Sequence, residues 1–436
     1  MQWQSIITNM KSLRIAILSH DPWIDLLGKA LADLKHEVHH VEINTYHKPQ
    51  DARDKILGLK PDFTLGRNYY DFISFHNNWS DEAGIEFKNL LEASQIPHAS
   101  WYLDSPAASG NLFLRKKWLS GYQPNGTCFF VTDRQDMSFF HKLSLPTAHL
   151  PMAAERDLIS RQMNQDKLTH YQTDLAFVGT PPPASGHAAI SFQSAQAVAA
   201  YYANLDGQKL FEVMVAMKNS GYDVPPTQPQ ILEKIGSAFF NFYTTFHIAP
   251  VEYHRERARL EKNIHQLTGI AKLPIAIDYR YSYYQLITSL WHFKKKGIRV
   301  YGGPDWSIWL GNYQSHYPRL PFDTELPEFL RAAKILFCLT KWQYYGAVHD
   351  RPLMTLVCGG FPLTDHREEI DDSFRPGEIV TYHSIEEADQ LVDYYLTHES
   401  ERREDIQKGQ ARVLANHTYH HRALDLVRKM SDHFSL

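Results

Sequence analysis

The residues with the clearest chemical potential lie between positions 346 and 360. A loop leads into a predicted short helix that begins near Arg351, and Gly359 and Gly360 let the chain turn closely into the next strand. The first N–H groups of a helix have no partner within the helix, so they attract anions such as a diphosphate. The Arg351 guanidinium adds a bidentate, charge-assisted contact. The pattern predicts an anion site, although an ordinary helix–strand corner with a surface arginine would have the same sequence pattern.

The elements around this stretch alternate between strands and helices, which is typical of parallel sheets covered by helices on both faces. In the first half, strands are predicted over 13–19, 37–43, 62–65, 71–75, 98–104, 128–132 and 147–151, and helices over 81–94, 109–119 and 134–143. In the second half, strands are predicted over 174–180, 298–303, 334–340 and 361–365. Ligands of such sheets bind at the carboxyl ends of the strands. Two successive blocks therefore predict two Rossmann-like domains that face each other across a cleft.

The segment between the strands at 174–180 and 298–303 is far longer than the dozen or so residues that a crossover needs. Helical patterns fill it, over 191–220, 228–246 and 252–268. We therefore predict a first domain over 12–165 and a second domain over 166–415 with a helical insertion at about 186–290. A C-terminal helix over 416–436 follows, and we consider that it packs back on the first domain.

The composition excludes several classes of protein. Lys and Arg total 45 and Asp and Glu total 49, a net charge of −4 that argues against a nucleic-acid partner. No apolar run approaches the roughly 18 residues that a transmembrane segment needs, and the N-terminus does not resemble a secretory signal. Cys128, Cys338 and Cys358 lie far apart and form no CxxC pair, which indicates buried thiols in a reducing compartment. We expect a cytoplasmic protein.

Several common cofactor and nucleophile motifs are absent from the sequence. There is no Walker A motif, GxGxxG, GxSxG or DxD. His417, His420 and His421 have a spacing that puts two imidazoles on one helix face as metal ligands, with a polar helix surface as the alternative. No Cys or acidic partner accompanies them, so we predict neither a metal nor a cofactor.

An ordered set of motifs resembles the C-terminal domain of GT-B glycosyltransferases, and most of all their CgeB-like, spore-maturation group. The matching elements are Arg351, Cys358-Gly359-Gly360, Leu363-Thr364-Asp365, Phe374-Arg375-Pro376-Gly377-Glu378, Tyr382, His417-Thr418-Tyr419 and Arg422. Upstream, the segments 101–106, 150–154, 174–180 and 301–303 also resemble that group. Each motif is weak alone, but all fall in the family's order, and only 181–290 has no counterpart.

The resemblance implies a GT-B fold and transfer of a sugar from a nucleotide-diphosphate donor, for which a UDP-sugar is our guess. The acceptor is then a glycan or a protein, no metal takes part, and fold analogy favours retention at the anomeric carbon. Arg351 is the first candidate for the phosphates and Lys341 the second. Close backbone approach to the donor is expected at Gly179, Gly302, Gly303, Gly359 and Gly360, unless these glycines serve plain turns. His349 and Asp350 border the donor loop and are candidates for the sugar.

One position departs from the family pattern. Met354 stands where the family has a glutamate that usually holds the ribose hydroxyls, and a thioether is a weak acceptor. Asp365, Glu368 or Glu369 then takes that role, or the donor is held differently, or the enzyme is degenerate.

The acceptor side is expected in the first domain. His20 and Asp21 follow its first strand, and Asp104 ends another strand, at the edge where ligands bind. Any of the three is a candidate for the general base or for orienting an acceptor hydroxyl. The alternative for Asp104 is that it only caps the following helix or turn.

Two other functions fit the same sequence. A catalytically silent GT-B-like binding or scaffold subunit is consistent with Met354 and the long insertion, and it would form a stable complex without turnover. A nucleotide-sugar epimerase is a third possibility, and it would convert its donor with no acceptor present. The sequence leaves the oligomeric state open.

Overall fold

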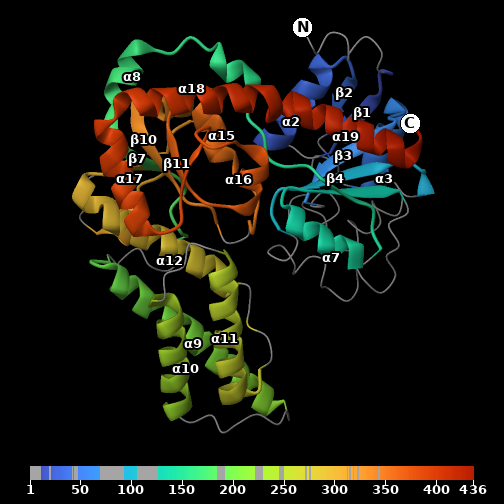
Figure 1. Ribbon diagram of the computed structural model, residues 1–436. Coiled ribbons are helices and arrows are strands. Elements are labelled where there is room, and N and C mark those ends of the chain that lie inside the picture. The colour runs from blue at the N-terminus through green and yellow to red at the C-terminus, as the bar shows by residue number, and fades with distance from the viewer. Residues whose placement is uncertain are drawn as a thin grey trace.

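The computed structural model describes residues 11–18, 21–41, 43, 48–68, 93–105, 126–142, 144–183, 192–220, 229–244, 250–270, 273, 276–311, 313, 316–317, 319–321, 324–341 and 344–436. These residues form two α/β domains that lie side by side, with a helical arm extending from the second domain (Figure 1). The predictions for a strand over 71–75 and helices over 81–94 and 109–119 lie outside the described residues.

The first domain contains a six-stranded sheet in the order β2-β1-β3-β4-β5-β6, and every pairing is parallel. Its strands are β1 (Arg14–Ile17), β2 (Glu37–His40), β3 (Phe63–Arg67), β4 (His98–Tyr102), β5 (Thr127–Val131) and β6 (Thr147–His149), and its helices include α2 (Pro22–Asp33), α3 (Pro49–Leu59) and α7 (Met137–Lys142). β4 and β5 are buried along their whole length. Such strands are covered on both faces, as expected for a parallel sheet.

The second domain repeats this plan with a parallel sheet in the order β12-β11-β10-β7-β8-β9. Its strands are β7 (Thr173–Val178), β8 (Arg299–Tyr301), β9 (His316–Tyr317), β10 (Ala333–Cys338), β11 (Pro362–Asp365) and β12 (Val380–Tyr382). Its helices include α8 (Gln165–Tyr171), α13 (Trp306–Leu310), α14 (Leu326–Ala332), α15 (Asp350–Val357), α16 (Glu368–Ser373), α17 (Ile385–Thr397) and α18 (Glu399–Asn416). Two parallel-sheet domains confirm the predicted fold class. Among these strands, β9 and β12 were not predicted from the sequence, because two or three residues carry little periodic signal.

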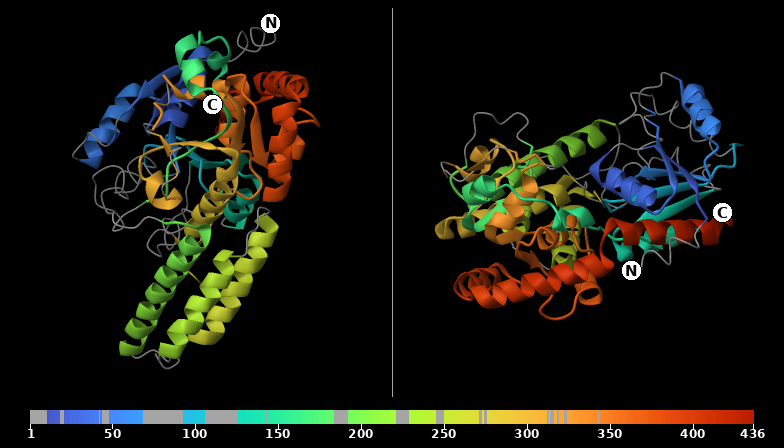
Figure 2. Two further views of the ribbon diagram at one scale, coloured as in Figure 1. Left: turned by 90° about the vertical axis from the view of Figure 1, so that its left-hand side faces the viewer. Right: turned by 90° about the horizontal axis from the view of Figure 1, so that it is seen from above.

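Helices fill the segment between β7 and β8, so the predicted helical insertion is present. It consists of α9 (Ala195–Asn219), α10 (Pro229–Thr244), α11 (Pro250–Thr268) and α12 (Ala276–Phe293). We call α9, α10 and α11 the helical arm; they project away from both sheets (Figure 2). α12 runs back to the second sheet, where the Phe293 ring lies 4.9 Å from the Phe337 ring.

The C-terminal helices of the chain connect the two domains. α18 lies on the second domain and α19 (Tyr419–Phe434) continues onto the first, where it packs against α2 (Figure 1). Arg422 donates from Nε to the Pro151 carbonyl at 2.7 Å, and Ala154 N–H donates to the His417 carbonyl at 2.9 Å. One apolar core runs from the first sheet through α19 to α15. No helix in the described ranges is long and apolar enough to cross a membrane.

Candidate functional site

A crevice of about 290 Å³ lies where the carboxyl ends of both sheets meet. Val178 and Gly179 after β7, Lys341 after β10 and the first turn of α15 line it from the second domain. Trp23 at the start of α2 and Asp104 after β4 line it from the first domain. The predicted cleft therefore brings together Gly179, Lys341, His349, Asp350, Arg351 and Asp104 from the sequence-based candidates.

The start of α15 faces this crevice. His349 caps the helix, since its Nδ1 accepts from Arg351 N–H at 3.2 Å. The Arg351 guanidinium donates to the Val178 carbonyl, which directs it along the end of β7. The cap already uses Arg351 N–H and Pro352 has no N–H, so the guanidinium is the main group of this first turn that favours an anion.

Asp350 links the two domains. Its Oδ2 accepts from the Trp23 indole N–H at 3.0 Å, and its Oδ1 lies 2.5 Å from His349 Nδ1. Burial raises the pKa of Asp350, but His349, the Arg351 guanidinium and the indole N–H outweigh burial and leave this pKa below its usual value. Asp350 is therefore a buried carboxylate with one oxygen, Oδ2, hydrogen-bonded across the domain boundary.

Lys341 enters the crevice from the end of β10. The side chain stays accessible to solvent, while the surrounding walls lower the pKa of its ammonium. Asp104 raises that pKa from the opposite wall and Arg351 lowers it further. A bound dianion would favour the charged form of this lysine.

Asp104 is held in place by Asn68 in the turn that follows β3. Asn68 donates from its amide to Asp104 Oδ2 at 3.0 Å, and its carbonyl oxygen accepts from Leu103 N–H at 2.7 Å. Asn68 has φ of 49°, a left-handed conformation that asparagine tolerates better than most residues. Asp104 thus faces the crevice and does not cap a described helix.

The other first-domain candidates lie differently. Asp21 is the N-cap of α2, where its Oδ1 accepts from Trp23 N–H at 3.0 Å and Ile24 N–H at 3.1 Å. Its Oδ2 lies 3.4 Å from Arg67. This carboxylate stabilises the helix start, and its role as a base or in orienting an acceptor hydroxyl stays a prediction. His20 lies outside the described residues.

The glycine candidates divide into two groups. Gly179 lines the crevice, whereas Gly302 and Gly303 lie behind it at the end of β8. Gly302 has φ of 144°, and a Cβ there would come within 1.8 Å of the Gly179 carbonyl oxygen, so only glycine lets these strand ends meet. Gly359 and Gly360 follow the C-terminal end of α15, away from the crevice, where Gly360 packs against the Leu330 carbonyl.

The acidic candidates for the ribose are engaged elsewhere. Asp365 is 0% exposed, accepts from Thr340 N–H at 2.7 Å and pairs with Arg367 at 2.6 Å. Glu369 accepts from Arg134 N–H at 2.7 Å, and Glu368 from the Gln135 amide at 3.1 Å. All three carboxylates therefore serve the second-domain core or the contact between domains in this structure.

Met354 faces away from the crevice. It lies one turn after Arg351 and lines a separate pocket with Trp23, Leu158 and Tyr419. Nothing at this position replaces the glutamate of the family pattern.

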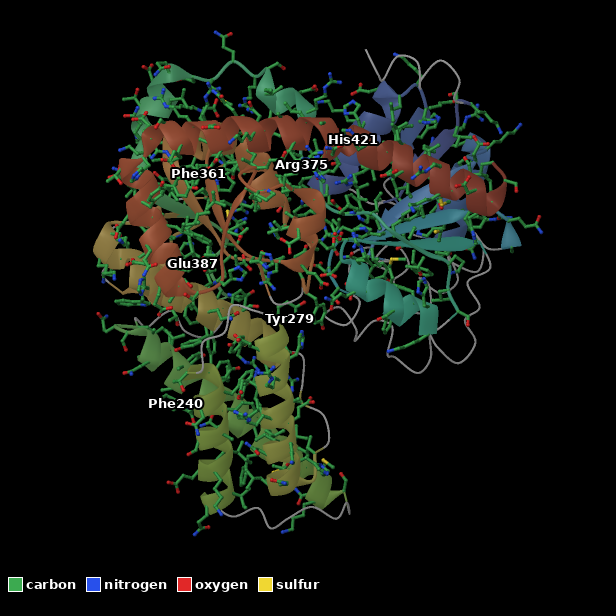
Figure 3. The ribbon with its side chains drawn as sticks, in the orientation of Figure 1. Phe240, Tyr279, Phe361, Arg375, Glu387 and His421 are labelled. Carbon is green, nitrogen blue, oxygen red and sulfur yellow. The ribbon has the colours of Figure 1, made fainter. Side chains whose placement is uncertain are left out.

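The three C-terminal histidines are spread over different contacts. His417 Nε2 lies 3.1 Å from the Ser373 carbonyl and His420 Nε2 lies 3.0 Å from Asp33. His421, which Figure 3 labels near the start of α19, forms a capping box with Thr418. Burial lowers the pKa of His417 and of His421 to about 4. Within the described ranges, no group of three or more His, Cys, Asp or Glu is arranged to hold a metal.

Several residues of the crevice were not predicted from the sequence. Trp23 and Tyr344 line it, Asn68 orients Asp104, and Ser282, Tyr283 and Leu286 of α12 form part of its wall. A helix of the insertion thus borders the site. Asn68 directly follows a strand, which is where ligand-binding residues of parallel sheets lie, and this position could have identified it from the sequence.

Residues 285–428 match the family model described as glycosyl transferase-like. This range contains Lys341, Arg351 and all of α15, but none of the first domain. No curated protein sequence matches the chain. The second domain thus contains a glycosyltransferase-like segment, and the narrower resemblance to the CgeB-like group stays a prediction.

Solved structures of similar overall shape have very different sequences. A sucrose-phosphate synthase from Thermosynechococcus elongatus is 10% identical with a TM-score of 0.49, covering 97% of this chain and 99% of that one. A UDP-forming α,α-trehalose-phosphate synthase from Burkholderia xenovorans is 9% identical with a TM-score of 0.45, covering 97% and 99%. HepE from Anabaena in complex with UDP is 8% identical with a TM-score of 0.45, covering 97% and 100%. These values are too low to assign an activity.

Proposed function

We propose that this protein is a glycosyltransferase that moves a sugar from a nucleotide-diphosphate donor to a hydroxyl of an acceptor. One observation carries the proposal: the crevice sets Arg351, Lys341 and the start of α15 on one wall and Asp104 on the other. The glycosyl transferase-like match covers the cationic wall and supports the same assignment.

The second-domain wall is suited to the donor. When the bond between sugar and phosphate breaks, negative charge develops on the departing diphosphate. Arg351 and Lys341 stabilise that charge without a metal ion, and preorganised groups of this kind are the strongest single source of catalysis in many enzymes. A UDP-sugar is the donor that we propose to test first.

The first-domain wall is suited to the acceptor. Asp104 accepts a proton from the acceptor hydroxyl or orients it, as a positioned carboxylate does in general base catalysis. The acceptor in this proposal is a glycan or a protein. We further propose retention at the anomeric carbon, which NMR of the product tests, and a cytoplasmic location, consistent with three free, buried cysteines.

The test combines a nucleotide-sugar panel with measurement of the released nucleoside diphosphate. We expect release that depends on both a donor and an acceptor, and loss of that release in Arg351→Ala with an unchanged circular dichroism spectrum. Conversion of the donor without any acceptor would indicate an epimerase. Unchanged release in Arg351→Ala would remove that residue from the proposal.

The position of Met354 favours a second candidate, a silent binding or scaffold subunit. The methionine offers no strong acceptor for ribose hydroxyls and points into the neighbouring pocket. A thermal-shift panel separates the two functions. A catalytic protein is stabilised by nucleoside diphosphates, whereas a scaffold shows no shift with any nucleotide and co-purifies with a stable protein partner.

A further inference from the structure

We propose that Asp133 of the first domain is a positioning residue that holds the anion-binding loop of the second domain in its working geometry. This inference rests on the proposed function for the identity of the ligand. Asp133 follows β5 and is 1% exposed. Its Oδ2 accepts from Gly346 N–H at 2.8 Å and from Ala347 N–H at 3.2 Å, both across the domain boundary. Its Oδ1 accepts from Gln135 N–H at 3.0 Å.

A second carboxylate makes the same kind of contact in the opposite direction. Glu369 of α16 accepts from Arg134 N–H at 2.7 Å, and its Oε2 lies 3.1 Å from His149 Nε2 of the first domain. Glu369 N–H also donates to the Gly346 carbonyl at 2.9 Å. Each domain therefore extends one buried carboxylate to backbone N–H groups of the other. We call Asp133, Glu369 and Gly346 the carboxylate clasp.

The clasp acts on the loop that leads to α15. From Gly346 only two residues intervene before His349, which caps α15, and Arg351 follows in its first turn. Within the second domain, Arg367 supports the other end of the loop by donating to the carbonyls of Thr340 and Tyr344, each at 3.1 Å. Asp133 supplies the matching support from the first domain. The position of Arg351 therefore depends on the Asp133 carboxylate, which lies 213 residues before Gly346 in the sequence.

Physical chemistry favours a positioning effect over mere adhesion between the domains. Hydrogen bonds to a carboxylate are stronger than neutral ones, and removing the acceptor leaves two buried N–H groups without a partner. The loop then relaxes, and small displacements of a binding group reduce its effectiveness sharply. An exposed ion pair bridges the same two surfaces: Arg134 lies 2.6 Å from Asp372, with 53% and 58% of the side chains exposed. Exposed pairs contribute little, so this pair provides a matched control.

The experiment compares Asp133→Ala, Asp133→Asn and the control Asp372→Ala in the full chain. Hydrogen–deuterium exchange of peptides covering 344–351 measures the clasp without any ligand, and calorimetry with UDP measures the anion site. We expect exchange at Gly346 and Ala347 to accelerate at least tenfold in Asp133→Ala, and the Kd for UDP to rise about tenfold. Asp133→Asn keeps one acceptor oxygen and falls between, while Asp372→Ala stays within twofold of the wild type.

Each outcome bears on the proposal. Exchange that stays slow in Asp133→Ala, or affinity that falls equally in Asp372→Ala, would overturn it. If Asp133→Ala lowers only the melting temperature and its folded fraction binds UDP normally, the carboxylate is structural and the positioning role is wrong. If the wild type binds no UDP, the proposed donor is at fault, and the exchange measurement alone then decides whether Asp133 holds the loop.

Discussion

The first-domain wall of the crevice presents a carboxylate, Asp104, whereas the second-domain wall presents Arg351, Lys341 and the first turn of α15. Both walls are edges of six-stranded parallel sheets, so the difference comes from the residues that follow the strands. On the first wall, the Asp104 carboxylate accepts a hydrogen bond from Asn68. On the second wall, the Lys341 ammonium makes no hydrogen bond or ion pair to any described residue. The same architecture thus holds an oriented carboxylate on one side and cationic side chains on the other.

Replacement of the first wall's carboxylate is expected to have the largest effect. In Asp104→Asn the amide keeps the size and the contact with Asn68 but loses the proton acceptor. We expect kcat to fall about 100-fold or more, with the Kd for UDP changed less than about threefold because the cationic wall is intact. The matched control is Asp54→Asn on α3, whose side chain is 66% exposed. A normal kcat in Asp104→Asn would assign the base elsewhere.

Replacement of the second wall's arginine is expected to affect binding more than any single change there. Arg351→Ala removes a guanidinium from the anion site, so the Kd for UDP should rise about 10- to 100-fold by isothermal calorimetry. Arg351→Lys restores the charge but not the planar fork, and we expect it to recover only part of the affinity. Arg428→Ala on α19, with a 67% exposed side chain, controls for loss of a positive charge. Equal affinities for Arg351→Ala and Arg428→Ala would place the anion site elsewhere.

A third prediction concerns the buried carboxyl group of Asp136 and its effect on the free energy of unfolding. Burial, together with Asp133 and Glu369, raises the pKa of Asp136 to about 8, although a hydrogen bond from Ser105 opposes the shift. Between about pH 4 and pH 8 the folded state holds a proton that the unfolded state has lost. The free energy of unfolding therefore falls as pH rises through this window and levels off above it.

The corresponding variant is Asp136→Asn, which keeps a neutral side chain at every pH. We expect the wild type to lose about 1 to 3 kcal/mol between pH 5 and pH 8 relative to this variant, measured by thermal unfolding. Asp371→Asn, whose partner is His366 and whose side chain is 71% exposed, serves as control. A wild type and an Asp136→Asn variant with parallel pH profiles would show that Asp136 titrates normally.

The sequence predicted part of each wall. On the second wall, Gly179, Lys341 and Arg351 were predicted because they lie at strand ends or at a helix start. Such positions are marked in the local sequence by apolar runs and turn residues. On the first wall, Asp104 was predicted from its strand end, whereas Trp23 was missed. Its indole contacts Asp350 at a sequence separation of 327, and no local pattern reports such a contact.

The direction of a side chain was the other quantity that the sequence could not supply. Asp365 and Glu369 have the right chemistry and lie near Arg351 in the chain, yet Asp365 turns inward to Arg367 and Glu369 turns to Arg134. The side chain of Asp365 is buried at the edge of the sheet, and the side chain of Glu369 is directed by the contact between the two domains. The buried clasp formed by Asp133 likewise depends on how two separately folded sheets meet.

The smallest expected effect concerns Lys341 and the pH dependence of binding. The crevice walls lower the pKa of this ammonium, and a bound diphosphate favours its charged form, so the affinity for UDP should fall as pH rises through the lowered pKa. In Lys341→Arg the side chain stays charged throughout, and the decline should disappear. Calorimetry of both proteins from pH 7 to pH 10 should give a difference of about two- to fivefold at the alkaline end, since the lysine contributes as a point charge. Parallel curves would mean that Lys341 does not contact the bound anion. The anion site would then consist of Arg351 and the start of α15.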